Sequence, residues 1–126
     1  MLQSNYNFRR IPESQFSGYT LRLADIRNQA ITAETNILSQ DQPCTYKPFS
    51  FFLVYCSFEN SGGLVIRRTF TDLGVTKSEV LNEGFPFADR AAYIFAFPVS
   101  EDELINFQYS QNTTAIKLTL MESQII

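Results

Sequence analysis

The stretch from residue 49 to residue 71, FSFFLVYCSFENSGGLVIRRTFT, constrains the fold more than any other part of the chain. Apolar side chains occupy both alternating faces of its first half: Phe49, Phe51, Leu53 and Tyr55 on one face, and Phe52, Val54, Cys56 and Phe58 on the other. Such a strand needs cover above and below. The pattern predicts a middle strand, with the core on one face and an arm, a loop or a neighbouring subunit on the other.

The residues ENSGG at 59–63 predict a tight reversal, after which Leu64 resumes a strand, so the stretch is expected to form a central β-hairpin. A turn centred on Ser61 gives these opposed pairs: Phe58 with Leu64, Cys56 with Ile66, Val54 with Arg68, and Phe52 with Phe70. A slip of one residue or a bulge at Gly62-Gly63 remains open. Under any register, Arg67 and Arg68 point to opposite faces. At least one guanidinium therefore needs an interior carboxylate partner or an exit at the sheet edge.

Alternation with period two predicts further strands at 19–24, 31–38, 91–99, 105–109 and 115–121, with a weaker one at 77–82. Residues 25–29 are expected to end the strand at 19–24. Residues 39–48 and 83–90 are expected to form loops, and 110–113 a hairpin loop. A helix is an alternative for 30–38, but its β-branched residues favour a strand. The prediction is an all-β protein, an antiparallel β-sandwich of about eight strands.

Residues 1–17, MLQSNYNFRRIPESQFS, show neither the strand period of two nor the helix period of about 3.6, and they contain Pro12. We therefore predict an extended N-terminal arm, followed by a single sandwich domain of residues 18–126. Isolated apolar residues in a polar segment are expected to dock on the protein's own flank or on another subunit. Only 18% of the residues are charged, so much of the surface is neutral and polar and loses little solvation energy in a contact. The candidate subunit contacts are Phe8, Arg9, Arg10, Ile11 and Phe16 on the arm, and Phe85 and Phe87 around Pro86.

Composition excludes most enzyme chemistry. The chain has no His, which removes Ser-His, Cys-His and His-metal sites, and its 2 Cys cannot form a usual zinc site. Cys56 is expected to be a buried apolar side chain. One acidic cluster, Glu101-Asp102-Glu103, could bind a hard cation or form a carboxylate pair with Asp89. We expect a protein that is not an enzyme and that uses no cofactor, metal or small-molecule substrate.

The net charge of −3 argues against electrostatic capture of nucleic acid. No apolar run is long enough to cross a membrane, and the first residues lack the apolar core of an export signal, so no signal peptide is expected.

A ligand-binding sandwich is the alternative function. Such modules bind carbohydrates with exposed aromatic rings and amide side chains, and the candidates here are Tyr46, Phe85, Tyr109 and Asn112. The chain has no Trp, the best stacking residue.

An irregular N-terminal arm, followed by about eight strands and a chain end just past a strand, resembles the single jelly-roll proteins of icosahedral viruses and phages, including penton and minor capsid proteins. The resemblance is one of architecture over residues 18–122. It implies a jelly-roll-like sandwich that forms homo-oligomers or binds other virion proteins, with the arm reaching beneath a neighbour. It also implies a virion location after synthesis in the host cytoplasm.

Overall fold

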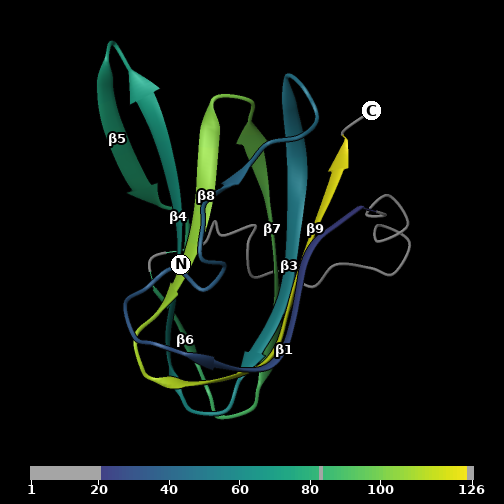
Figure 1. Cartoon of the computed structure of the whole chain (residues 1–126), viewed down its shortest axis with the longest axis vertical. Helices are drawn as coiled ribbons and strands as arrows, with labels where there is room; N and C mark the ends of the chain where they lie inside the picture. The colour runs from purple at the N-terminus through teal and green to yellow at the C-terminus, as the bar shows by residue number, and fades with distance from the viewer. Residues whose placement is uncertain (1–20, 83, 125–126) are drawn as a thin grey trace.

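The computed structural model describes residues 21–82 and 84–124, which form two antiparallel sheets packed face to face (Figure 1). The nine strands in chain order are β1 (Leu21–Ile31), β2 (Gln42–Pro43), β3 (Phe49–Phe58), β4 (Gly62–Asp72), β5 (Val75–Val80), β6 (Phe85–Phe87), β7 (Ala92–Ser100), β8 (Glu103–Tyr109) and β9 (Thr113–Gln124). The predicted all-β sandwich is confirmed. The predicted arm and residues 18–20 lie outside the described residues, as do Phe8, Arg9, Arg10, Ile11 and Phe16.

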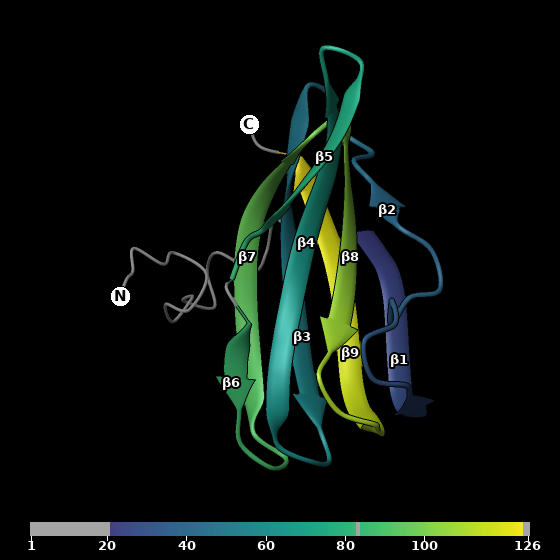
Figure 2. The same ribbon diagram turned by 90° about the vertical axis from the view of Figure 1, so that its left-hand side faces the viewer.

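The strand order is that of a jelly roll. One sheet runs β1-β9-β3-β7 and the other β2-β8-β4-β5, with β6 also pairing β4. Starting from the β4–β5 hairpin and moving outward along the chain, β3 pairs with β7, β2 with β8 and β1 with β9, all antiparallel. Each pair encloses the previous one, as if one long hairpin had been rolled up into two sheets. Figure 2 shows the same roll from the side, with the strands running nearly parallel to its long axis.

The predicted central hairpin is wrong, although both of its strands exist. β3 lies between β7 and β9 in one sheet, and β4 pairs with β8, β5 and β6 in the other. Residues 59–61 therefore cross from sheet to sheet, and none of the pairs predicted across Ser61 forms. Alternation decides which face a side chain occupies but says nothing about which strand lies alongside.

Other predictions also need correction. The loops expected at 39–48 and 83–90 contain the short strands β2 and β6, because their backbones pair with β8 and β4. β1 continues through 25–29 to Ile31, because its backbone pairs with β9 along this range while Ile26 packs against the core. Residues 32–39 form turns with one isolated bridge, Asn36 to Gln108, and not a strand. Glu34 and Ser39 have positive φ angles of 62° and 71°, and the Asn36 side chain accepts hydrogen bonds from the backbone at Leu38 and Phe107. Residues 110–112 connect β8 to β9 between the sheets and do not form a hairpin.

The core is aromatic. Phe52, Phe58, Phe95, Phe97, Phe107 and Tyr109 are fully buried between the sheets with aliphatic side chains from every long strand except β5. The rings of Phe58 and Tyr109 stack with centroids 4.0 Å apart, and Phe87 meets Phe58 edge-on at 5.5 Å. Pairs of this kind add about 0.5–1.5 kcal/mol each beyond the area they bury. The core therefore fills the space between the sheets with large, geometrically specific contacts.

Arg68 satisfies the expectation raised by the Arg67-Arg68 pair. It lies on the inner face of β4, where its guanidinium forms ion pairs with Glu79 and Glu103. Arg67 points to the other face, and its Nη1 is 3.4 Å from Ser78 Oγ. The inner arginine has the carboxylate partners that its position demands.

Candidate functional site

The most concentrated polar chemistry inside the sandwich is a cluster of Cys44, Ser50 and Glu122. Glu122 Oε2 accepts hydrogen bonds from Thr45 N at 2.6 Å, from Tyr46 N at 3.3 Å and from the Ser50 hydroxyl. The Cys44 Sγ atom lies 3.1 Å from Ser50 Oγ and 2.8 Å from the carbonyl oxygen of Tyr46. The cluster joins the end of β9 to the loop between β2 and β3.

This cluster combines a thiol, a hydroxyl and a carboxylate, but it is closed to substrate. Ser50 and Glu122 are 0% exposed, and Cys44 is 9% exposed. Within the described part of the chain, Glu122 Oε1 has no hydrogen-bond partner. A buried acceptor that receives two backbone N–H groups and a hydroxyl fixes the loop in place. We therefore assign the cluster a structural role.

Sequence reasoning missed Glu122, although a signal was present. Leu118, Leu120 and Glu122 share one face of β9, and the two leucines are core residues. A carboxylate on the apolar face of an alternating strand must be hydrogen-bonded if the strand folds.

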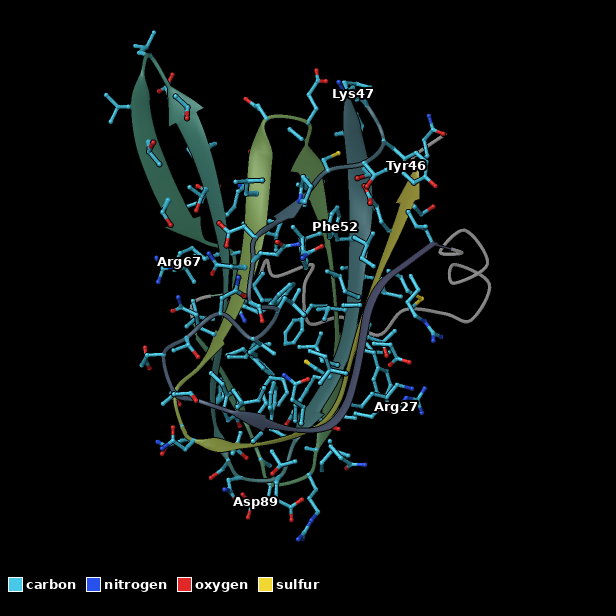
Figure 3. The ribbon with its side chains drawn as sticks, in the orientation of Figure 1. Arg27, Tyr46, Lys47, Phe52, Arg67 and Asp89 are labelled. Carbon is cyan, nitrogen blue, oxygen red and sulfur yellow. The ribbon has the colours of Figure 1, made fainter. Side chains whose placement is uncertain are left out.

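The acidic residues do not form a carboxylate pair. Asp89 precedes β7 and accepts a hydrogen bond from Ser61 N at 2.6 Å, whereas Glu101 and Glu103 follow β7. The nine residues of β7 separate them by roughly 30 Å. Figure 3 shows Asp89 at one end of the sandwich and Lys47, whose Nζ lies 3.6 Å from Glu101, at the other. In residues 21–82 and 84–124, no three His, Cys, Asp or Glu side chains lie close enough together to hold a metal ion.

The four candidate ligand contacts are not brought together. Tyr109 is a core residue, 0% exposed, whose hydroxyl donates to the Asn60 carbonyl at 2.7 Å; burial raises its pKa to about 12. Phe85 is partly buried against Tyr93 and Phe95, at centroid distances of 5.0 and 5.5 Å. Tyr46 and Asn112 lie near opposite ends of β9, whose 12 residues span roughly 40 Å.

Phe87, predicted as a subunit contact, is 3% exposed and packs into the core. Its partner in that prediction, Phe85, remains partly accessible. The FPF segment is the short strand β6, which pairs with the first residues of β4. Its rings close one end of the sandwich.

Cys44 and Cys56 are both free and buried. Burial raises the pKa of the Cys56 thiol far above its ordinary value, so the thiol stays protonated at neutral pH. It packs in the core as a small apolar side chain, as the sequence predicts.

The outer face of the β1-β9-β3-β7 sheet is apolar on one side and charged on the other. On β3, Leu53 is 1% exposed, although it points away from the central core, and Phe51 and Tyr55 are partly buried. Ala96 of β7 and Met121 of β9 flank Leu53 in the sheet. These five residues, Phe51, Leu53, Tyr55, Ala96 and Met121, form what we call the outer apolar patch.

Charged residues border this patch along β1. Asp25 lies 3.0 Å from Arg22, 3.2 Å from Arg27 and 3.1 Å from the Thr119 hydroxyl. Burial opposes the charged form of Asp25, but hydrogen bonds from Arg27 and Thr119 and the charges of both arginines hold the pKa of its carboxyl below the ordinary value. Figure 3 shows Arg27 on the outside of this sheet.

One small open pocket, about 160 Å³ in volume, lies beside the turns that follow β1. Its lining is mostly amide and hydroxyl side chains, from Gln29, Thr32, Thr35, Asn36 and Ser39. Such groups can hydrogen-bond a small polar ligand. The pocket includes none of the residues predicted as ligand contacts.

Comparison of the chain with protein-family models, with curated proteins and with solved structures finds no match. The described residues contain no helix long and apolar enough to cross a membrane.

Proposed function

We propose that this chain is a non-enzymatic structural subunit of a virus or phage particle, such as a capsid, penton or minor capsid protein. The strand order carries the proposal: β1-β9-β3-β7 facing β2-β8-β4-β5 is a double-sheet jelly roll, an architecture that recurs among viral capsid subunits. Because the same architecture also serves lectins and cupins, the support is by analogy of fold.

The proposed mode of assembly uses the flanks of the sandwich and the N-terminal arm. The partly exposed members of the outer apolar patch, Phe51, Tyr55 and Met121, offer a contact surface, and the low content of charged residues keeps the cost of desolvating the surrounding surface small. The proposed partners are further copies of the chain and other virion proteins, and the proposed location is the virion.

The arm residues provide the first test. Replacing Phe8, Ile11 and Phe16 together by Ala is expected to reduce the sedimentation coefficient of the assembled protein, because the apolar anchors are lost. The circular dichroism spectrum and melting temperature should stay unchanged. Deletion of residues 1–16 should have the same effect.

Arg9→Lys combined with Arg10→Lys is the matched control, since it keeps the charge of the arm and its apolar anchors. This control is expected to assemble like the unaltered chain. A protein that sediments as a monomer with or without the arm, and that assembles with no other virion protein, would contradict the proposal.

The pocket beside the turns after β1 favours a second candidate, a carbohydrate-binding or receptor-attachment module. Gln29 and Thr32 are exposed on its rim, where their side chains are available to hydroxyl groups. This function predicts binding on a glycan array that is lost in Gln29→Ala and Thr32→Ala without a change in melting temperature. Thr76→Ala on the distant strand β5 is the control, and an unaltered chain that binds no glycan would count against this candidate.

A further inference from the structure

The β4–β5 hairpin extends beyond the body of the sandwich in both ribbon views (Figures 1 and 2). Every residue from Thr71 to Glu79 is exposed, so both faces of β5 lack cover from the described residues. Leu73 at the tip is 96% exposed and Val75 is 57% exposed. Leu73 also has a positive φ of 51°, a conformation that is costly for a branched apolar residue. The described residues do not bury the Leu73 side chain, so packing within the chain does not offset the cost of this backbone conformation.

β5 is also the most regular of the four sheet edges formed by the described residues. The edge strand β7 contains Pro98, β2 has two residues including Pro43, and β1 has a register shift and a positive φ at Asn28. Such features protect an edge from pairing with another chain. β5 has six residues, no Pro and an unbroken register with β4. Its backbone is therefore available for pairing along the edge that faces away from β4.

The charges on β5 are complementary to themselves. Lys77 and Glu79 lie two residues apart on one face, on either side of Ser78. If two copies of β5 pair antiparallel about a two-fold axis at Ser78, Lys77 of each copy lies opposite Glu79 of the other. An axis at residue 77 places the two Lys77 side chains opposite each other. An axis at residue 79 places the two Glu79 side chains opposite each other. Charge therefore selects the register centred on Ser78.

The same register extends contacts already present in each chain. Within each chain Glu79 is paired with Arg68 and Lys77 with Asp72, so the contact between Lys77 of one copy and Glu79 of the other joins these pairs into a row of alternating charges. Thr76 comes opposite Val80 of the partner subunit on the other face, so the new ladder runs from Thr76 to Val80.

We propose that β5 pairs with β5 of a second copy in this register, which joins the β2-β8-β4-β5 sheets of two subunits into one continuous sheet. The inference deepens the proposed assembly role and rests on it in one respect, that copies of the chain associate. It names a second copy as the occupant of this edge because the edge is complementary to itself.

Charge reversal tests the pairing. Lys77→Glu alone and Glu79→Lys alone each place like charges opposite each other twice in the dimer, and each is expected to raise its dissociation constant roughly tenfold or more in sedimentation velocity. In an equimolar mixture of the two variants, each mixed dimer again has opposite charges facing each other at both contacts, so the mixture is expected to restore dimers. Because these charges are exposed, raising the salt concentration should weaken the unaltered dimer as well.

Circular dichroism of each variant shows whether the hairpin change has disturbed the fold, and Lys77→Arg is the control that keeps the charge. If the single variants associate as tightly as the unaltered chain, or if the mixture gains nothing over either variant, the β5 pairing is overturned. Association that survives in those variants but is lost when the arm anchors are removed would leave the proposed function standing without the β5 contact. If the unaltered full-length chain stays monomeric, the β5 pairing is overturned. The proposed function is then decided by assembly with other virion proteins.

Discussion

Replacing Tyr109 by Ala is expected to lower the free energy of unfolding by about 3–5 kcal/mol, measured by urea denaturation followed by circular dichroism. Tyr109 is fully buried and stacks on Phe58 with ring centroids 4.0 Å apart, so the substitution opens a large cavity in the aromatic end of the core. A residue that served as an exposed platform for sugars would instead change binding and leave stability intact.

Tyr109→Phe is the matched control because it keeps the ring and removes only the hydroxyl. That hydroxyl donates to the Asn60 carbonyl at 2.7 Å, so the expected loss is about 0.5–1.5 kcal/mol. If Tyr109→Ala melted at the temperature of the unaltered chain, the packing described between β3 and β8 would be incorrect.

Glu122→Ala is expected to cost about 2–4 kcal/mol, the second large effect. The substitution leaves the amides of Thr45 and Tyr46 and the hydroxyl of Ser50 without their common acceptor. Since Ser50 is fully buried, water reaches it only if the loop before β3 opens. Limited proteolysis within residues 43–48 should accordingly become faster in this variant.

Glu122→Gln keeps a side-chain oxygen that can accept hydrogen bonds but removes the negative charge. The amide oxygen can take the place of Oε2, and the amide nitrogen can occupy the position of Oε1, which has no hydrogen-bond partner in the described part of the chain. We expect this variant to lose about 1 kcal/mol, because hydrogen bonds to a neutral acceptor are weaker. Equal losses in the two variants would mean that the hydrogen bonds to Oε2 do not hold the loop.

The sequence predicts faces well and neighbours poorly. The alternating apolar residues of β3 correctly indicate a middle strand with two faces to cover, and it lies between β7 and β9. Its predicted partner was β4, the next strand in the chain, but a rolled hairpin places these two strands in opposite sheets. Among the described strands, only β4 and β5, at the centre of the roll, are sequence neighbours that also pair as an ordinary hairpin.

Polar residues caused the two errors near the start of the described chain. Asp25 and Arg27 lie in the segment predicted to end the first strand. In the structure they lie on the charged outer side of β1, where they form an ion pair with each other. The segment after Ile31 alternates like a strand, yet the Asn36 side chain bonds to backbone groups and turns the chain. Local patterns cannot reveal such contacts, because Phe107 lies 71 residues further along.

The candidate site was predicted least well. Alternation already places Tyr109 with Ile105 and Phe107, both core residues, so its burial could have been inferred from the strand pattern. Tyr46 and Asn112 were grouped by residue type, and no local signal indicates that the length of β9 separates them. The self-complementary charges of β5 are visible in the sequence, but their importance depends on β5 being an open edge, which only the topology reveals.

The native mass of the full-length chain, measured by native mass spectrometry over a wide range of concentrations, tests the proposed assembly role most directly. We expect discrete species of more than one copy, whose population falls in Lys77→Glu and when Phe8, Ile11 and Phe16 are replaced by Ala. A single monomeric mass at every concentration, unchanged by these substitutions and by the addition of other virion proteins, would contradict the proposed assembly role.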